Sequence, residues 1–189
     1  MAEIPTPSQT VGPFYALGTS WLHTHDLARH ATSGERITIA GTVVDGDGKP
    51  VPDAFLEIWQ ANAQGKYAHP DDPQDKPVDQ GFSGFGRVPT DKDGSFHFVT
   101  IKPGAVPGLG NSLQAPHILV AVFMRGMLRH AYTRIYFSDE ATNASDPVLG
   151  LVEDVARRNT LVAERVPGKP EYRWDVVMQG ERETVFFDA

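Results

Sequence analysis

Glycine and proline interrupt this chain at short intervals along most of its length, and this feature limits its fold more than any other. The 189 residues include 18 glycines and 15 prolines, well above the roughly 12% that these two types share in an average protein. Both residue types end helices and mark turns, so the spacing disfavours long helices and favours many short strands. The sequence therefore predicts an all-β fold.

Strand-like stretches fill the intervals between these turns. In residues 54–60, Phe55, Glu57 and Trp59 alternate onto one face, which is typical of a strand with one buried side. Turn residues at 45–48 predict a hairpin after the strand 37–44. A second hairpin is expected from 86–88 and 95–99, which are separated by 91–94 and closed by 101–104. Two later strands, 118–123 and 131–137, are joined across residues 125–126. Closing strands are expected at 160–165 and 172–178. Strands at this density predict a β-sandwich.

Two segments of the chain differ from this pattern. Residues 146–152 could form a short helix, with Asp146 as its N-cap and Pro147 in its first turn. In residues 1–36, Pro5, Pro7, Gly12 and Pro13 oppose regular structure, while Phe14 and Trp21 are too apolar to be left in water. We expect an extended N-terminal arm at 1–36, packed against another surface, and a single β-sandwich domain at 37–189.

Composition excludes several kinds of partner. Lysine and arginine number 17 against 24 acidic residues, a formal charge of −7, so nucleic acid is not an expected partner. The chain has no cysteine, which rules out disulfides and thiolate metal sites. No stretch approaches the ~18 apolar residues of a membrane span, and the first residues lack an export signal. We expect no membrane partner and a cytoplasmic location.

Two weak signals for metal binding have simpler explanations. The segment Asp91–Gly94 resembles the start of a calcium loop, but the bidentate acid expected twelve residues on is Lys102. His23, His25 and His30 cluster in the arm without a carboxylate at a recognisable spacing. The first is interpreted as a turn and the second as surface histidines.

Several motifs in order resemble the intradiol ring-cleavage dioxygenase family. They are residues 12–15 (GPFY), 55–62 (FLEIWQAN), 65–67 (GKY), 82–87 (FSGFGR), 90–94 (TDKDG), 100–104 (TIKPG) and 115–117 (APH). The closing residues 179–188 are similar to those of the non-catalytic subunits in the family's two-subunit members. The resemblance covers nearly the whole chain and implies the β-sandwich fold with an N-terminal arm and short helical segments.

In this family, catalytic chains hold a non-haem Fe(III) ion with two tyrosinates and two histidines, hard donors that suit that ion. The resemblance places the first tyrosine at Tyr67 and the first histidine at His117. The second tyrosine falls at Val106 and the second histidine at Leu119, and neither side chain can donate a lone pair. The arginine expected near the first histidine is Gln114. The resemblance therefore implies that this chain holds no iron and contributes no catalytic residue.

The same resemblance implies a role beside a homologous, iron-bearing beta-type subunit, in a hetero-oligomer that acts on a small aromatic acid and dioxygen. The ferric ion would belong to that partner. Thr10, Gly12 and Pro13 of the arm are then expected to line the active-site cleft, and Arg134 is expected to face the bound acid. Alternation groups Arg134 with Tyr132 and Tyr136, and a guanidinium among aromatic rings suits a benzoate carboxylate. An ordinary salt bridge at Arg134 is the alternative.

Two other functions stay open on the sequence alone. One is a self-sufficient dioxygenase with an altered set of metal ligands. The other is a binding module without enzymatic activity, because residues 41–59 and 90–104 also suit transthyretin-like or carboxypeptidase-regulatory-like sandwiches.

Overall fold

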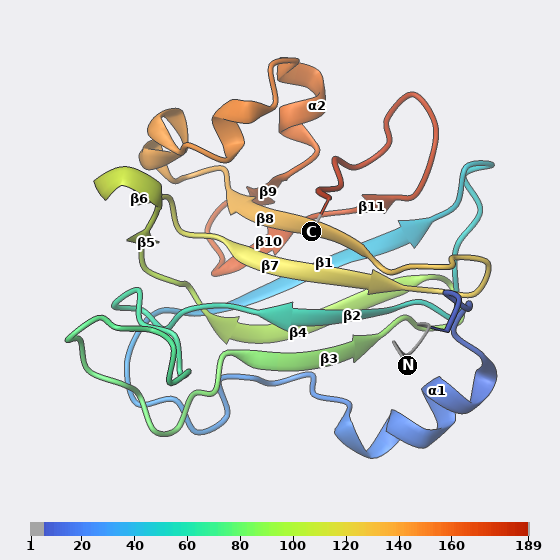
Figure 1. Ribbon diagram of the computed structural model, residues 1–189, viewed down its shortest axis with the longest axis horizontal. Helices are drawn as coiled ribbons and strands as arrows, with labels where there is room; N and C mark the ends of the chain where they lie inside the picture. The colour runs from blue at the N-terminus through green and yellow to red at the C-terminus, as the bar shows by residue number, and fades with distance from the viewer. Residues whose placement is uncertain (1–5, 189) are drawn as a thin grey trace, which may run out of the picture.

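The computed structural model describes residues 6–188 and is a β-sandwich with short helical segments. One layer contains β1 (Arg36–Val44), β4 (Ser95–Ile101), β10 (Glu171–Arg173) and β11 (Val176–Val177). The other contains β2 (Phe55–Trp59), β3 (Phe85–Pro89), β7 (Ile118–Phe123) and β8 (Ala131–Phe137). Strand β9 (Val162–Arg165) joins them, because it pairs with β10 on one side and with β8 on the other. The predicted fold class is confirmed (Figure 1).

Short elements connect and flank the strands. They are α1 (Pro13–Thr19), η1 (Ser20–Leu22), β5 (Val106–Pro107), η2 (Leu109–Asn111), β6 (Leu113–Gln114), η3 (Ala141–Ser145), η4 (Leu149–Leu151) and α2 (Val155–Asn159). The η segments are 3₁₀ turns. None of the helices formed by residues 6–188 has the length and apolar character that a membrane crossing requires.

The core lies between the two layers and takes one face of each strand. Ile39 and Phe98 from the first layer and Leu56, Val120 and Ile135 from the second are fully buried in it. Burying a side chain of this size stabilises the fold by about 1.5–3 kcal/mol. The opposite face of β2, β7 and β8 points away from the core and carries most of the residues considered below.

Two predicted hairpins are wrong in their pairing, although their turns are present. Strand β1 pairs with β4 along seven residues. The turn at 45–48 is closed by an isolated bridge between Val44 and Pro50 and by the hydrogen bond from the N–H of Val51 to the carbonyl of Val43. Likewise β3 pairs with β2, while the turn at Asp91–Gly94 carries the chain into the other layer. Turn residues fix where the chain reverses but not which sheet receives the next strand. The β7–β8 hairpin is confirmed.

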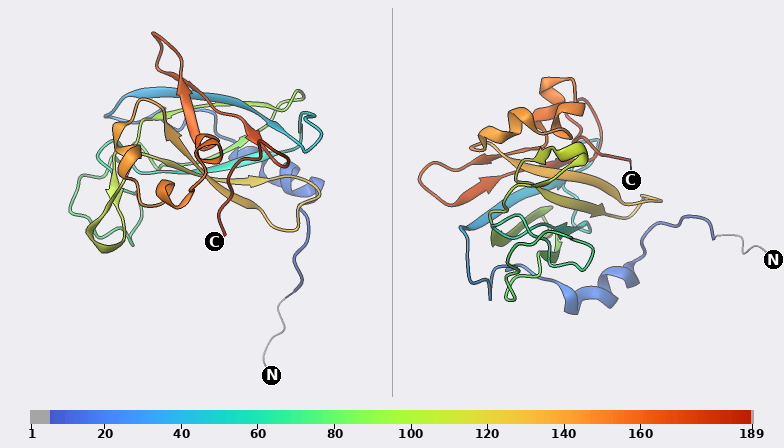
Figure 2. Two further views of the ribbon diagram at one scale, coloured as in Figure 1. Left: turned by 90° about the horizontal axis from the view of Figure 1, so that it is seen from above. Right: turned by 60° about the vertical axis from the view of Figure 1, so that its left-hand side comes forward.

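The arm and the expected helix also need correction. Pro13 does not prevent regular structure but begins α1, at the first helical position where proline is tolerated. Between Asp146 and Val152 there is only the 3₁₀ turn η4, although the Asp146 side chain accepts hydrogen bonds from Val148 and Leu149 as a cap would. Figure 2 shows the described residues before α1, 6–12, extending away from the sandwich. In contrast, Leu27 and Ala28 of the arm are buried in the core.

Candidate functional site

Two glycines allow a close backbone contact that places Tyr67 beside Val106. Gly65 has a φ of +73°, and a Cβ atom there would lie 1.9 Å from the carbonyl oxygen of Ala105. The N–H of Gly104 donates to the carbonyl of Asn62 at 2.9 Å. Larger residues would force these two loops apart.

A buried ion pair stiffens the loop that follows Tyr67. The Lys66 ammonium group lies 3.3 Å from the carboxylate of Asp72 and donates to the carbonyls of Asp72 and Gln74. Asp72 accepts hydrogen bonds from the backbone N–H groups of Tyr67 and Gln74. Burial opposes the charge on Asp72, but these hydrogen bonds together lower its pKa to about 2. Tyr67 is therefore held by a rigid loop.

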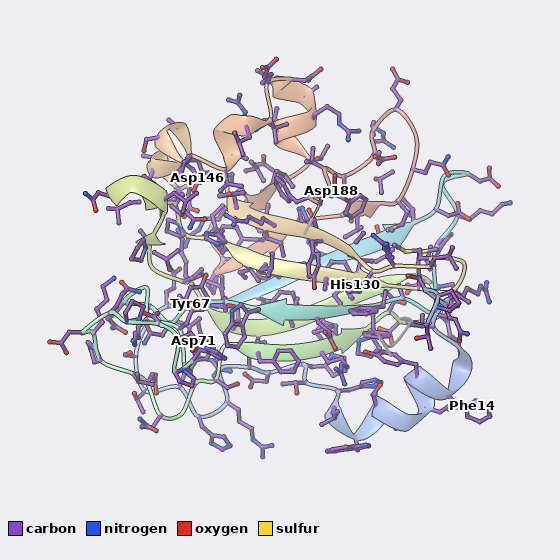
Figure 3. The ribbon with its side chains drawn as sticks, viewed as in Figure 1. Phe14, Tyr67, Asp71, His130, Asp146 and Asp188 are labelled. Carbon is purple, nitrogen blue, oxygen red and sulfur yellow. The ribbon has the colours of Figure 1, made fainter. Side chains whose placement is uncertain are left out.

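This loop forms one wall of a pocket of about 480 Å³. Trp59 of β2 stacks on Tyr67 with 5.7 Å between ring centroids and covers the inner side. The lining residues are Trp59, Tyr67, His69, Asp71, Asp72, Pro73, Gln74, Val106 and Pro107. Figure 3 shows Tyr67 and Asp71 at the end of the sandwich that lies opposite Phe14 in α1.

His117 and Tyr67 are both uncharged at neutral pH. The His117 side chain is buried, and its Nδ1 atom lies 2.8 Å from the carbonyl oxygen of Ala115. Burial, followed by the positive charge of Arg134, lowers the pKa of His117 to about 4. Burial raises the pKa of the Tyr67 phenol, with Arg134 acting in the opposite direction. The charge of Arg134 thus acts on both side chains.

Arg134 is the centre of a polar network on the outer face of β8. Its Nη1 donates to Oε1 of Gln114 at 2.7 Å and to the hydroxyl of Tyr136 at 3.3 Å. The Tyr136 hydroxyl donates to Oδ1 of Asp146 at 3.0 Å, and Asp146 also accepts from the backbone N–H of Ala115 at 2.7 Å. We refer to Tyr67, Gln114, His117, Arg134, Tyr136 and Asp146 as the Arg134 cluster.

The four positions implied as metal ligands do not fit a ferric ion. Val106 and Leu119 offer no donor atom, and Tyr67 would have to lose a proton that burial makes harder to lose. The guanidinium of Arg134 adds a positive charge next to the two remaining donors, which opposes a trivalent cation. Within residues 6–188, no group of three or more histidine, aspartate or glutamate side chains could hold a metal ion either.

The structure separates the other candidate residues from Arg134 within this chain. The Thr10 hydroxyl accepts a hydrogen bond from the N–H of Gly126, in the turn after β7. Gly12 is the N-cap of α1 and Pro13 follows it. Arg134 instead points to Gln114, which precedes the opposite end of β7. Whether these four residues contact substrate stays a prediction.

The sequence does not reveal Tyr136 and Asp146 as members of this cluster. It predicts Asp146 only as a helix cap and Tyr136 only as a neighbour of Arg134 by alternation. Their hydrogen bond joins β8 to the loop before η4, a contact between segments that local pattern does not reveal. The one sequence signal for this cluster is that Tyr136 follows Arg134 by two residues in a strand, which places both side chains on the same face.

Fold and donor set together define a ring-cleaving dioxygenase scaffold in which half of the metal donors have been replaced. The family model described as "Dioxygenase" matches residues 11–180. The chain belongs to the intradiol ring-cleavage dioxygenase family, whose members normally use non-haem Fe(III).

Individual relatives agree with this assignment. The chain is 48% identical to the protocatechuate 3,4-dioxygenase alpha chain of Burkholderia cepacia, covering 97% of both chains. It is 36% identical to the beta chain of the protocatechuate 3,4-dioxygenase from the same organism, over 85% of this chain and 73% of that one. The dioxygenase domain of a Streptomyces sp. SirexAA-E fusion protein superposes with a TM-score of 0.63 and 28% identity, over 96% of this chain and 100% of that domain.

Proposed function

We propose that this chain is the alpha-type subunit of a protocatechuate 3,4-dioxygenase and that it binds no iron itself. The single observation that carries the proposal concerns the four positions where the family's metal ligands are expected. Two of them hold Val106 and Leu119, which have no donor atom, although the fold is that of the family. The near full-length similarity to an alpha chain supports it.

The complete enzyme would cleave 3,4-dihydroxybenzoate between its two hydroxylated carbons. Both atoms of dioxygen enter the product, 3-carboxy-cis,cis-muconate, in the β-ketoadipate pathway of aromatic catabolism. A non-haem ferric ion held by a homologous beta-type subunit would supply the chemistry that makes the catechol reactive toward dioxygen. The present chain would shape the cleft and stabilise the assembly, from a cytoplasmic location as the sequence predicts.

Arg134 is proposed to bind the carboxylate of the substrate. Its Nη1 is engaged by Gln114 and Tyr136, while Nε and Nη2 have no hydrogen-bond partner in the described part of the chain. A guanidinium with one edge fixed and another available suits a carboxylate, which can accept two charge-assisted hydrogen bonds. Thr10, Gly12 and Pro13 are proposed to line the cleft of the partner subunit.

Expression of the chain with and without an iron-bearing beta-type subunit tests this function. We expect a colourless chain when it is expressed alone, and dioxygenase activity with iron confined to the other subunit when both are present. Iron analysis of the separated subunits is the measurement. A red-brown, active chain on its own would favour the self-sufficient dioxygenase, and failure to form an active complex would favour a binding module.

A further inference from the structure

The helical segment of the arm presents an apolar stripe to solvent. Phe14 and Leu17 of α1 and Trp21 of η1 are 83%, 69% and 79% exposed. Leu17 follows Phe14 by three residues, which places these two side chains on the same side of α1, and Trp21 lies in η1, which follows α1 directly. Three large apolar side chains gathered in this way mark an interaction surface more often than a free one. We call these three residues the arm stripe.

The opposite side of α1 is fixed to the sandwich. Tyr15 stacks on Phe55 of β2 and Phe123 of β7, with ring centroids 5.1 and 5.8 Å away. The Arg87 guanidinium lies 5.9 Å from the centre of the Tyr15 ring. Further along, the N–H of Thr24 donates to the carbonyl of Arg87 at 2.9 Å. The stripe is therefore displayed by an anchored element, which lowers the entropy lost on docking.

Polar groups around the stripe are satisfied within the segment. The indole nitrogen of Trp21 donates to the carbonyl of Gly18 at 2.9 Å. The hydroxyls of Thr19 and Ser20 donate to the carbonyls of Tyr15 and Leu17. If a partner covered this surface, each of these donors would keep its hydrogen-bond acceptor, so the desolvation cost is small.

The charge pattern also suits a protein interface. No aspartate, glutamate, lysine or arginine occurs from residue 6 to residue 25, although the whole chain has a formal charge of −7. The centres of protein interfaces are depleted in charged residues and enriched in aromatic ones. An uncharged stripe can therefore meet another subunit without like-charge repulsion.

The exposed area indicates a partner of protein size. Together the three side chains leave roughly 400–500 Å² of apolar surface in water, given that an aromatic residue buries about 150–250 Å². A stable interface takes about 800 Å² from each partner, so the stripe would form about half of one. The stripe also continues directly from Thr10, Gly12 and Pro13, which are proposed to line the partner's cleft.

We propose that Phe14, Leu17 and Trp21 are the main docking surface by which this chain binds its iron-bearing partner subunit. The inference rests on the proposed function and adds the site of subunit recognition to it. The arm then has two roles along its length. Thr10, Gly12 and Pro13 line the partner's cleft, and the arm stripe that follows them binds the partner subunit.

The test compares two triple variants of the full chain, each mixed with the iron-bearing subunit. One carries Phe14→Ser, Leu17→Ser and Trp21→Ser. The matched control carries Leu109→Ser, Leu151→Ser and Val155→Ser, which are 95%, 75% and 64% exposed on segments away from α1 (Figure 1). Sedimentation and titration give the dissociation constant of each complex, and thermal unfolding of the isolated chains checks that both fold.

We expect the stripe variant to bind the partner at least about 100-fold more weakly, as for central apolar anchors, and the control to stay within about threefold of the original chain. Equal binding by both triple variants would overturn the docking inference and leave the proposed function intact. If the original chain does not bind the iron-bearing subunit at all, the proposed function fails instead. Loss of self-association without loss of partner binding would assign the stripe to a second copy of this chain and also overturn the inference.

Discussion

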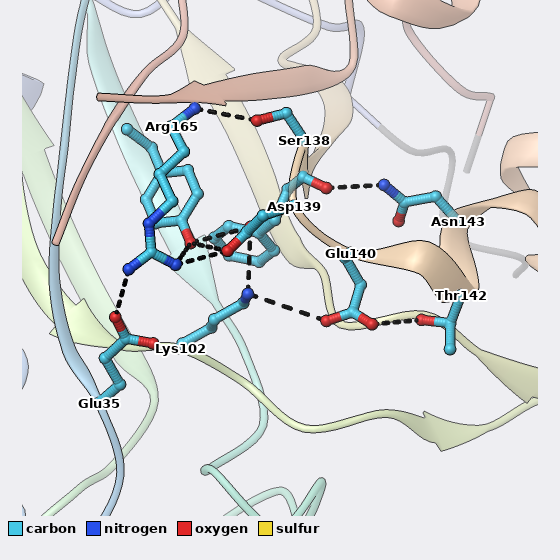
Figure 4. A network of polar contacts seen from close by, with 10 residues as sticks. Glu35, Lys102, Ser138, Asp139, Glu140, Thr142, Asn143 and Arg165 are labelled. Atoms are coloured by element: carbon cyan, nitrogen blue, oxygen red, sulfur yellow. Dashed lines mark hydrogen bonds and ion pairs between the residues drawn. The ribbon is translucent and has the colours of Figure 1, made fainter. Parts of the chain in front are cut away.

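Arg134 and Arg165 lie in two polar clusters of the same sandwich, and the clusters differ in how charge is matched. Arg165 donates to the carboxylates of Asp139 and Glu35 and to the hydroxyl of Tyr172. Lys102 adds a second cation that pairs with Asp139 at 3.1 Å and Glu140 at 3.8 Å. Figure 4 shows this network, in which each cation meets at least one carboxylate.

Arg134 has only uncharged acceptors by comparison. Its hydrogen-bond partners among residues 6–188 are Gln114 and Tyr136, and the carboxylate of Asp146 is reached through the Tyr136 hydroxyl. A half-buried cation without a carboxylate partner can still bind an anion. In the matched network, each cation is already paired with a carboxylate. The contrast supports the proposal that Arg134 binds the substrate carboxylate, while the Arg165 network stabilises the fold.

The largest expected effect concerns the binding of Fe(III) at the Arg134 cluster. We expect the variant Val106→Tyr, Leu119→His, Arg134→Gln to bind Fe(III) roughly 100-fold more tightly than the variant that keeps Arg134, because the guanidinium repels the ion at close range. Iron content and the visible absorption of phenolate-bound iron measure this, with thermal unfolding as the check on folding. Equal affinity, or no binding by either variant, would show that the guanidinium is not the deciding charge.

Removing the shared carboxylate of the matched network is expected to cost stability. Asp139→Ala leaves Lys102, Arg165 and the buried Tyr172 hydroxyl without their common partner. The free energy of unfolding should fall by about 2–4 kcal/mol in a denaturant titration. Asp47→Ala, which removes an exposed pair with Lys49, is the control and should change it by less than about 0.5 kcal/mol. If Asp139→Ala lowered the free energy of unfolding by as little as Asp47→Ala, the Arg165 network would not be a stabilising one.

A matched pair of arginine variants separates recognition from stability. In the reconstituted complex, Arg134→Ala should raise the KM for protocatechuate by an amount equivalent to about 1–3 kcal/mol, because a charge-assisted contact to the carboxylate is lost. Arg165→Ala should leave KM unchanged. An unchanged KM for Arg134→Ala would take that residue out of the substrate site.

The smallest expected effect is a pH dependence of stability that originates at His117. Its pKa is lowered to about 4 in the folded chain from an ordinary value of about 6.5. Below 6.5 the unfolded chain therefore binds the proton more readily, and stability falls as the pH drops toward 4. His117→Gln should remove about 1.5 kcal/mol of the loss between pH 6.5 and 5. Identical pH profiles for the two proteins would contradict the buried, neutral histidine.

Periodicity predicted the sandwich and most of its strands, because alternation along residues 54–60 or 131–137 reports directly on a buried face. Pairing was harder, as β1 and β4 show, since the partner of a strand is chosen by the whole core. The same limit applies to the site. The missing donors at Val106 and Leu119 could be read from the sequence through a family resemblance, but the hydrogen bonds from Arg134 to Gln114 and from Tyr136 to Asp146 join segments that lie far apart along the chain.

The tight contact of Gly65 with Ala105 also bears on how this pocket could be altered. A Cβ atom at Gly65 would lie 1.9 Å from the carbonyl oxygen of Ala105, so the loops that carry Tyr67 and Val106 are brought together by backbone geometry. Substitutions of the lining side chains can therefore change what the pocket accepts without moving its walls.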